Sequence, residues 1–212
     1  GSSGSANGTG TAASFNYPYG VAIDGSGNVY VGDRYNHLIR KITSAGVVTT
    51  LAGTGSTGSA NGTGTAASFR YPYGVAIDNS GNVYVADTYN HKIRKITAAG
   101  VVTTLAGSGS VGSANGTGTA ASFYRPFGVA VDGSGNVYVA DTYNHKIRKI
   151  TSGGVVTTLA GGSAGSANGT GTAASFYYPR DVAVDGNGNV YVGDTNNNLI
   201  RKITAAGVVT TL

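Results

Sequence analysis

The sequence predicts an all-β fold, a β-propeller of four blades in which each blade is a four-stranded antiparallel sheet. Three observations predict it. Phenylalanine recurs at positions 15, 69, 123 and 176, so one unit occurs four times at spacings of 54, 54 and 53 residues. Each unit holds four short runs rich in Val, Ile, Thr and Tyr, separated by turns that contain Gly and Asn. Consecutive antiparallel strands repeated along a chain are typical of propeller blades.

The second unit shows the expected elements in order. The loop of residues 79–81 ends in a glycine that accepts a positive φ, so it is predicted to close a hairpin. Val83 and Val85 flank Tyr84 in the alternation of a half-buried strand. Pro72 stands at the start of the first strand, where a missing amide costs little. The strands are expected at residues 74–78, 82–86, 91–97 and 101–106, with turns at 79–81, 87–90 and 98–100.

A linker rich in small residues precedes every unit. In the second unit its core is Ser-Ala-Asn-Gly-Thr-Gly-Thr-Ala-Ala-Ser at residues 59–68, where Gly and Asn favour turns. The end of this core predicts one helical turn with Thr65 as its cap. Residues 1–14 match the later linkers. We therefore expect one repeat domain over residues 1–212, with a linker-equivalent segment at 1–14 and blades at 15–52, 69–106, 123–160 and 176–212.

The repeated motif resembles a known family. The second unit reads YPYGVAIDNSGNVYVADTYNHKIRKIT, which is similar to an NHL repeat, named for an Asn-His-Leu triplet. The first unit has this triplet intact as Asn36-His37-Leu38, whereas the fourth departs with Asn196-Asn197-Asn198-Leu199. The resemblance covers almost the whole chain and implies a propeller, usually of six blades rather than four. It implies no single activity, since NHL propellers include binding platforms, RNA binders and a few lyase- or lactonase-like enzymes.

The composition narrows the class of protein. The chain has no Cys, Met, Trp, Glu or Gln, so disulfides and Cys-ligated zinc are excluded. So narrow an alphabet in near-identical units favours recent amplification of one unit or deliberate engineering. No apolar run approaches the length of about 18 residues that a membrane span needs, so no membrane partner is expected. No signal-peptide pattern is present, and a start at Gly-Ser suggests a trimmed chain whose natural parent could be exported.

The repeat register allows a ring to close. Gly162, the counterpart of Gly1, follows Leu159 after two intervening residues, and Leu212 is the counterpart of Leu159. Gly1 can therefore follow Leu212 in space, either within one molecule or on a neighbour. A four-blade ring forces larger angles between blades than a six-blade ring. Self-association into a larger homo-oligomeric ring is the alternative to monomeric closure, because an open array leaves two apolar faces bare.

The four units differ most around each proline and in the turn between the second and third strands, both expected on the face that carries the linkers. Two interpretations stay open. The face binds a small molecule or peptide, such as a sugar or a nucleotide base, or its aromatic rings pack the blade tops and vary where packing is loose. For a binding face the expected ligand-binding residues are Arg180 and Asp181, which break the repeat, with an aromatic rim of Tyr19, Tyr73 and Phe127.

No metal, cofactor or catalytic group is predicted. His37, His91 and His145 occupy one repeat position, and equivalent residues of a ring lie too far apart to meet around one ion. We expect them to hydrogen-bond the neighbouring turn. The Asp-Gly-Ser-Gly-Asn loops lack the carboxylates of a calcium loop and are predicted to be hairpin turns. Repeat symmetry singles out no catalytic set.

The charges are spread around the repeat. The formal net charge is +5, but eight of the 14 basic residues are Arg-Lys pairs that recur on the third strand of every unit. Their stems are expected to cover apolar surface while the charges reach solvent, which leaves no single basic patch and makes nucleic acid an unlikely partner. The aspartates after the second strands are expected to accept turn hydrogen bonds and to pair with Arg or His: Asp33, Asp87, Asp141 and Asp194.

The sequence therefore favours a non-enzymatic repeat scaffold, engineered or recently amplified, with ligand binding on the linker face as its one candidate activity. The first alternative is a fragment of an exported bacterial binding propeller. A lyase- or lactonase-like propeller enzyme comes next, and it would need an asymmetric cluster of carboxylates or His at the channel mouth.

Overall fold

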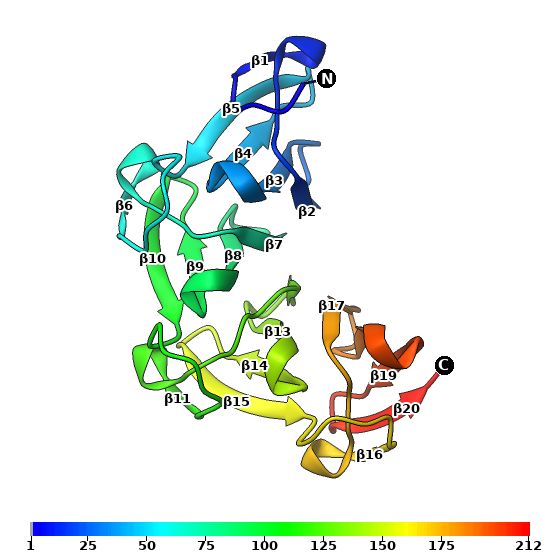
Figure 1. Ribbon diagram of the computed structural model, residues 1–212. Coiled ribbons are helices and arrows are strands. Elements are labelled where there is room, and N and C mark those ends of the chain that lie inside the picture. Colours follow the sequence, from blue (N-terminus) through cyan, green and yellow to red (C-terminus); the bar gives the residue numbers. More distant parts are fainter. Residues whose placement is uncertain (1) are drawn as a thin grey trace.

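In the computed structural model, which describes residues 2–212, the chain forms four antiparallel sheets arranged side by side in an open arc (Figure 1). The sheets are the four blades of a propeller, and the predicted all-β architecture is confirmed. The two chain ends lie at opposite ends of the arc. Gly1, the first residue of the predicted segment 1–14, lies outside the described residues.

Four strands of each blade follow chain order from the inside of the arc outward. The first strands are β2 (Pro18–Ile23), β7 (Pro72–Ile77), β12 (Val129–Val131) and β17 (Pro179–Val184). The second strands are β3 (Val29–Asp33), β8 (Val83–Asp87), β13 (Val137–Asp141) and β18 (Val190–Asp194). The third strands are β4 (Leu38–Ile42), β9 (Lys92–Ile96), β14 (Lys146–Ile150) and β19 (Leu199–Ile203). The fourth strands are β5 (Val47–Ala52), β10 (Val101–Ala106), β15 (Val155–Ala160) and β20 (Val208–Thr211).

Each sheet has five strands rather than the predicted four. In the first blade Gly8 pairs with Val48 and Thr9 with Val47, so the linker covers the outer edge of the fourth strand. An uncovered edge would leave unpaired N–H and C=O groups, which is the physical reason for the fifth strand. The prediction missed it because each added strand is only two residues long. These strands are β1 (Gly8–Thr9), β6 (Gly62–Thr63), β11 (Gly116–Thr117) and β16 (Gly169–Thr170).

Short 3₁₀ helices complete each unit. The helical turn predicted in the linker is present, but its N-cap is Thr63 rather than Thr65 and no side chain caps it. All helices within residues 2–212 are three-residue turns, far too short to cross a membrane. They are η1 (Gly10–Ala12), η3 (Gly64–Ala66), η5 (Gly118–Ala120) and η7 (Gly171–Ala173) in the linkers, and η2 (Arg34–Asn36), η4 (Thr88–Asn90), η6 (Thr142–Asn144) and η8 (Thr195–Asn197) between the second and third strands.

The hydrophobic core lies between blades. We call the side of a blade that faces the next blade its leading face, and the opposite side its trailing face. Between the second and third blades, Tyr84 and Ile93 of the leading face pack in one cluster with Phe123, Val129 and Val137 of the trailing face. The same arrangement recurs between the first and second blades and between the third and fourth. Each blade is therefore stabilised by its neighbours, as in other repeat proteins.

A buried ion pair joins the second and third strands of each blade. The arginine of every Arg-Lys pair is completely shielded from solvent, so the prediction that these charges reach solvent was wrong for arginine. Burial is possible because a carboxylate lies at the end of the neighbouring strand, and the prediction that these aspartates pair with Arg is confirmed. The pairs are Arg40–Asp33, Arg94–Asp87 and Arg148–Asp141 at 2.9 Å, and Arg201–Asp194 at 3.1 Å.

Candidate ligand-binding site at the channel mouth

The linkers and the turns between the second and third strands meet on one face of the arc. In the first unit the Asn16 amide donates to Asp33 Oδ1 at 2.8 Å, and the Tyr35 amide donates to the Asn16 carbonyl at 3.0 Å. Asn36 Nδ2 reaches the Gly4 carbonyl at 2.7 Å. The predicted shared face is confirmed by these contacts, which lock each turn to its linker.

On this face, at the inner ends of the first strands, lies a cavity of about 230 Å³. We call it the mouth pocket. It gathers residues from all four blades, which is possible because the inner strands converge along the inside of the arc. Its lining residues are Tyr19, Gly20, Tyr73, Gly74, Gly128, Arg180 and Asp181.

The predicted aromatic rim is only partly exposed. Tyr19 is 49% exposed and lies against Tyr73, with ring centroids 3.8 Å apart and a tilt of 35°. Tyr73 is 9% exposed, and its burial together with the adjacent Tyr19 hydroxyl raises the pKa of its phenol, so it stays protonated. Phe127 does not line the pocket. It is 8% exposed and packs edge-on against Tyr73 at 4.3 Å, which makes it a supporting residue.

The two residues that break the repeat in the fourth unit lie together at the pocket wall. Arg180 is exposed, and its guanidinium carbon stands 5.7 Å from the Phe127 ring. Asp181 accepts a hydrogen bond from the Val182 amide at 3.0 Å. Its Oδ1 lies beside Gly128 of the preceding blade, 2.6 Å from where a Cβ on that glycine would stand, and desolvation raises the pKa of this carboxyl although the residue as a whole is exposed.

A second cation that was not among the predicted site residues adjoins the pocket. The guanidinium carbon of Arg34 lies 5.8 Å from the ring of Tyr19 and 5.5 Å from that of Tyr73. Its Nε is buried and has no hydrogen-bond partner. The sequence signal was available, since Arg34 replaces the threonine that the other three units have at this position: Thr88, Thr142 and Thr195.

The histidines are structural. His37 Nδ1 accepts a hydrogen bond from the Tyr71 amide of the next blade at 3.2 Å, and His91 and His145 repeat this contact with Arg125 and Tyr178. The expected bonding to a neighbouring turn is confirmed and runs across the blade interface. Within residues 2–212 no group of three or more His, Cys, Asp or Glu side chains is placed to hold a metal ion.

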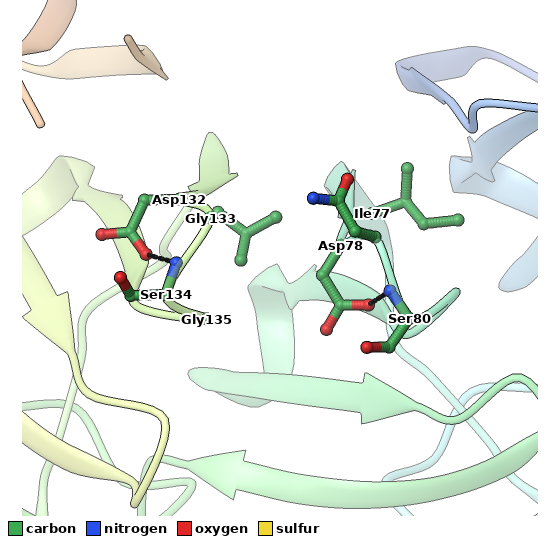
Figure 2. Close-up of a pocket in the computed structure, with 9 residues that line it drawn as sticks. Ile77, Asp78, Ser80, Asp132, Gly133, Ser134 and Gly135 are labelled. Carbon is green, nitrogen blue, oxygen red and sulfur yellow. Dashed lines mark hydrogen bonds between the residues drawn. The ribbon is translucent and has the colours of Figure 1, made fainter. Parts of the chain in front are cut away.

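The opposite face of the arc carries hollows between hairpin loops. One of about 280 Å³ separates the loops of the second and third blades, where Asp78 and Asp132 point into their own loops (Figure 2). Asp78 accepts hydrogen bonds from the Ser80 and Asn82 amides, the Asn82 side chain and the Tyr84 hydroxyl. With its oxygens so engaged, this carboxylate closes a hairpin, as predicted, and is not free to bind a ligand.

Comparison with solved structures places the fold among propellers. The chain superposes on a structural genomics protein of unknown function from Bacteroides thetaiotaomicron with a TM-score of 0.73 and 27% identity, covering 92% of this chain and 48% of that one. It superposes on virginiamycin B lyase from Staphylococcus aureus with a TM-score of 0.64 over 92% of this chain and 55% of that one. At 14% identity the second likeness concerns the fold alone.

Sequence comparison gives the family. The chain is 31% identical over 209 residues to Protein SUPPRESSOR OF QUENCHING 1, chloroplastic, of Arabidopsis thaliana, which covers 92% of this chain but only 20% of that protein. The family model of the NHL repeat matches four segments, residues 15–42, 69–96, 123–150 and 176–203. They make up more than half of the 212 residues and contain the first three strands of every blade. The chain therefore belongs to the NHL repeat family.

Proposed function

We propose that the chain is a non-enzymatic propeller scaffold whose mouth pocket binds a small ligand with an acidic group and a flat or sugar-like ring. One observation carries the proposal. Arg34 of the first unit and Arg180 and Asp181 of the fourth all break the repeat, and they converge on the same pocket from opposite ends of the chain.

The charges around the pocket favour an anion. The cations Arg34 and Arg180 both act on the Tyr73 hydroxyl, since each lowers the pKa that burial raises. Asp181 is the one carboxylate that lines the pocket, so a single negative charge stands against these two cations. An acidic ligand oxygen between the two guanidinium groups would gain charge-assisted hydrogen bonds. The exposed Tyr19 ring offers a stacking surface for the rest of the ligand.

The same lining supports a binding role rather than a catalytic one. Acid–base chemistry in such a site commonly uses a histidine or a pair of carboxylates, and the pocket lining has one carboxylate, Asp181, and no histidine. The histidines use Nδ1 to hold the next blade and do not line the pocket. The near-identical units and the restricted alphabet further support an origin by recent amplification or by engineering of one NHL unit.

The test is binding to an array of sugar phosphates, glycans with uronic acids and mononucleotides, followed by calorimetry on any positive compound. We expect the double variant Arg180→Tyr, Asp181→Gly, which restores the repeat, to bind at least tenfold more weakly. Arg34→Thr restores the repeat in the first unit and is expected to weaken binding as well.

Arg70→Ala is the matched control. It removes a positive charge from an exposed residue of the same face, 6.0 Å from the Tyr89 ring and outside the mouth pocket. Affinity should not change in this variant. An array with no positive compound, or equal affinity in the wild type and the double variant, would leave the scaffold role and remove the binding role.

A further inference from the structure

The first blade has a bare trailing face. Val21 and Ile23 on β2 are each 66% exposed, whereas Val75, the counterpart of Val21 in the second blade, is 6% exposed. Val75 is covered by the leading face of the first blade, in a cluster with Tyr30 and Ile39. No blade of the chain covers the same surface on the first blade, which stands at one end of the arc (Figure 1).

The fourth blade has a bare leading face. Ile200 on β19 is 55% exposed, while its counterparts Ile39, Ile93 and Ile147 are completely buried. A shallow hollow of about 280 Å³ lies beside Ile200 on this face. Its wall is mostly apolar and is formed by β17, β18 and β19: Asp181, Val182, Ala183, Tyr191, Val192, Gly193 and Ile200.

We propose that the leading face of the fourth blade binds the trailing face of the first blade in a second copy of this chain, head to tail. The chain itself contains three examples of this interface, formed by the same residue types at the same repeat positions. The proposed contact between two chains therefore repeats the interface that already joins neighbouring blades within one chain. A heterologous contact of this kind closes into a ring or extends as a filament.

Polar groups at the two ends also match. At two internal interfaces a threonine hydroxyl donates to the proline carbonyl of the next blade, from Thr88 to Pro126 and from Thr142 to Pro179, both at 2.7 Å. The fourth unit keeps this threonine as Thr195, which is exposed, and Pro18 at the other end of the arc is exposed too. A second copy would bring this donor and acceptor together.

A second pair matches in the same way. At each internal interface His Nδ1 accepts the amide of the residue before proline, which holds a left-handed φ of 52°, 47° or 50°. In the fourth unit Asn198 replaces the histidine with the same left-handed backbone, and Tyr17 at the far end has the same φ of 51°. The Oδ1 atom of Asn occupies the same place along its side chain as Nδ1 of His. Asn198 can therefore accept the Tyr17 amide of a second copy.

One departure decides the geometry of the new contact. At internal interfaces a glycine lets the inner strands approach, since a Cβ on Gly20 would lie 2.5 Å from the Tyr73 carbonyl oxygen. The fourth unit has Asp181 here, so the new junction must be wider at its inner edge. Inner strands stand further from the axis in a ring with more blades. Two chains supply eight blades, the upper end of the usual range of about four to eight.

The experiment is mass measurement by light scattering across a concentration series. For the wild type we expect a mass near twice the 21.1 kDa of one chain, or larger if the contact extends as a filament. Val21→Asp and Ile200→Asp each place a charge on one bare face and should give single chains. Both positions are exposed, so folding is retained, and circular dichroism checks this. Val111→Asp is the control, since Val111 is 57% exposed but lies in a linker outside both faces.

Mixing the two variants tests the head-to-tail arrangement. The Val21→Asp chain keeps an intact leading face and the Ile200→Asp chain an intact trailing face, so the mixture should regain pairs that neither variant forms alone. If two leading faces, or two trailing faces, bound each other instead, the variant with that face intact would still form pairs, and mixing would not increase the number of pairs. A wild-type mass of one chain at all concentrations, or pairs that survive in both variants, would overturn the proposal.

Discussion

The Arg94 guanidinium lies 2.9 Å from the Asp87 carboxylate, and both side chains are fully shielded from solvent. Arg94 also donates to the carbonyl oxygens of Ser68 and Ala60 and to Asn61 Oδ1, all in the linker before its own blade. One buried charge therefore fixes the path of a Gly-rich segment that has little apolar surface of its own. The same connection occurs in each of the four units.

Breaking this pair should cost much of the stability. We expect Arg94→Met to lower the free energy of unfolding by about 3–5 kcal/mol, because Asp87 would keep a buried charge without its partner. Lys95→Met is the matched control on the next residue. Lys95 is half-buried, with Nζ 5.7 Å from the Tyr84 ring, and its loss should cost less than about 1 kcal/mol. Urea unfolding measures both, and equal losses would contradict the account.

The interface between blades gives a second prediction. Replacing Val75 and Ile77 together by Ala should destabilise by several kcal/mol, at about 1–3 kcal/mol for each buried aliphatic side chain. The same double change at Val21 and Ile23 should cost less than about 1 kcal/mol in dilute solution, since both are exposed in the single chain. Thermal and urea unfolding compare the pair, and a similar cost in both would mean that these faces are not distinguished by packing.

A third prediction concerns the approach of the inner strands. The Gly74 amide donates to the Phe127 carbonyl of the next blade at 3.0 Å, and a Cβ on Gly74 would overlap that carbonyl oxygen. Gly74→Ala should therefore push the two blades apart and destabilise by about 1–3 kcal/mol. Gly25→Ala is the control, because nothing lies within 4 Å of its added Cβ. A neutral Gly74→Ala would show that the inner strands can separate freely.

The architecture could be predicted from sequence because its signals are local and repeated. Spacing and alternation located Val83 and Val85 on a strand, and the fourth strand was expected at the residues where β10 lies. The linker strands could not be predicted from sequence, because a strand of two residues such as Gly62 and Thr63 is too short to show a periodicity. These residues are ordered by pairing with β10. The burial of Arg94 also depends on a tertiary partner, which propensity does not encode.

The candidate site was predictable where a residue differs from its repeat counterparts. That comparison identified Arg180 and Asp181, which line one pocket with Tyr19 and Tyr73. The comparison gave no information on burial, so Phe127 was expected at an exposed rim although it is buried and packs edge-on against Tyr73. Arg34 was missed as a site residue because its unit lies far from Arg180 in sequence, and only the curvature of the arc brings both to Tyr73.

The last prediction concerns the loss of folding stability at acidic pH. Burial lowers the pKa of all three histidines, His37, His91 and His145. The positive charge of Arg70 lowers the pKa of His37 and His91 further, and Arg125 adds to the effect on His91. Asp194 acts in the opposite sense and raises the pKa of His145. A depressed pKa means that the folded chain binds fewer protons than the unfolded chain. The stabilisation is therefore present above the unfolded value of about 6.5 and is lost as pH falls below it. Protonation would also turn the Nδ1 acceptor into a donor that faces an amide.

The chain supplies its own control substitution, because Asn198 already occupies the histidine position of the fourth unit with a left-handed backbone. Replacing all three histidines by Asn should keep an acceptor for each amide and remove their titration. We expect the wild type to lose more unfolding free energy than this variant between pH 7 and pH 5. Asp87 and Asp141, whose pKa burial raises to about 6, titrate in both chains, so the difference between the chains isolates the histidines. If the unfolding free energy changed with pH in the same way in the two chains, the histidine contacts would not hold the blades together.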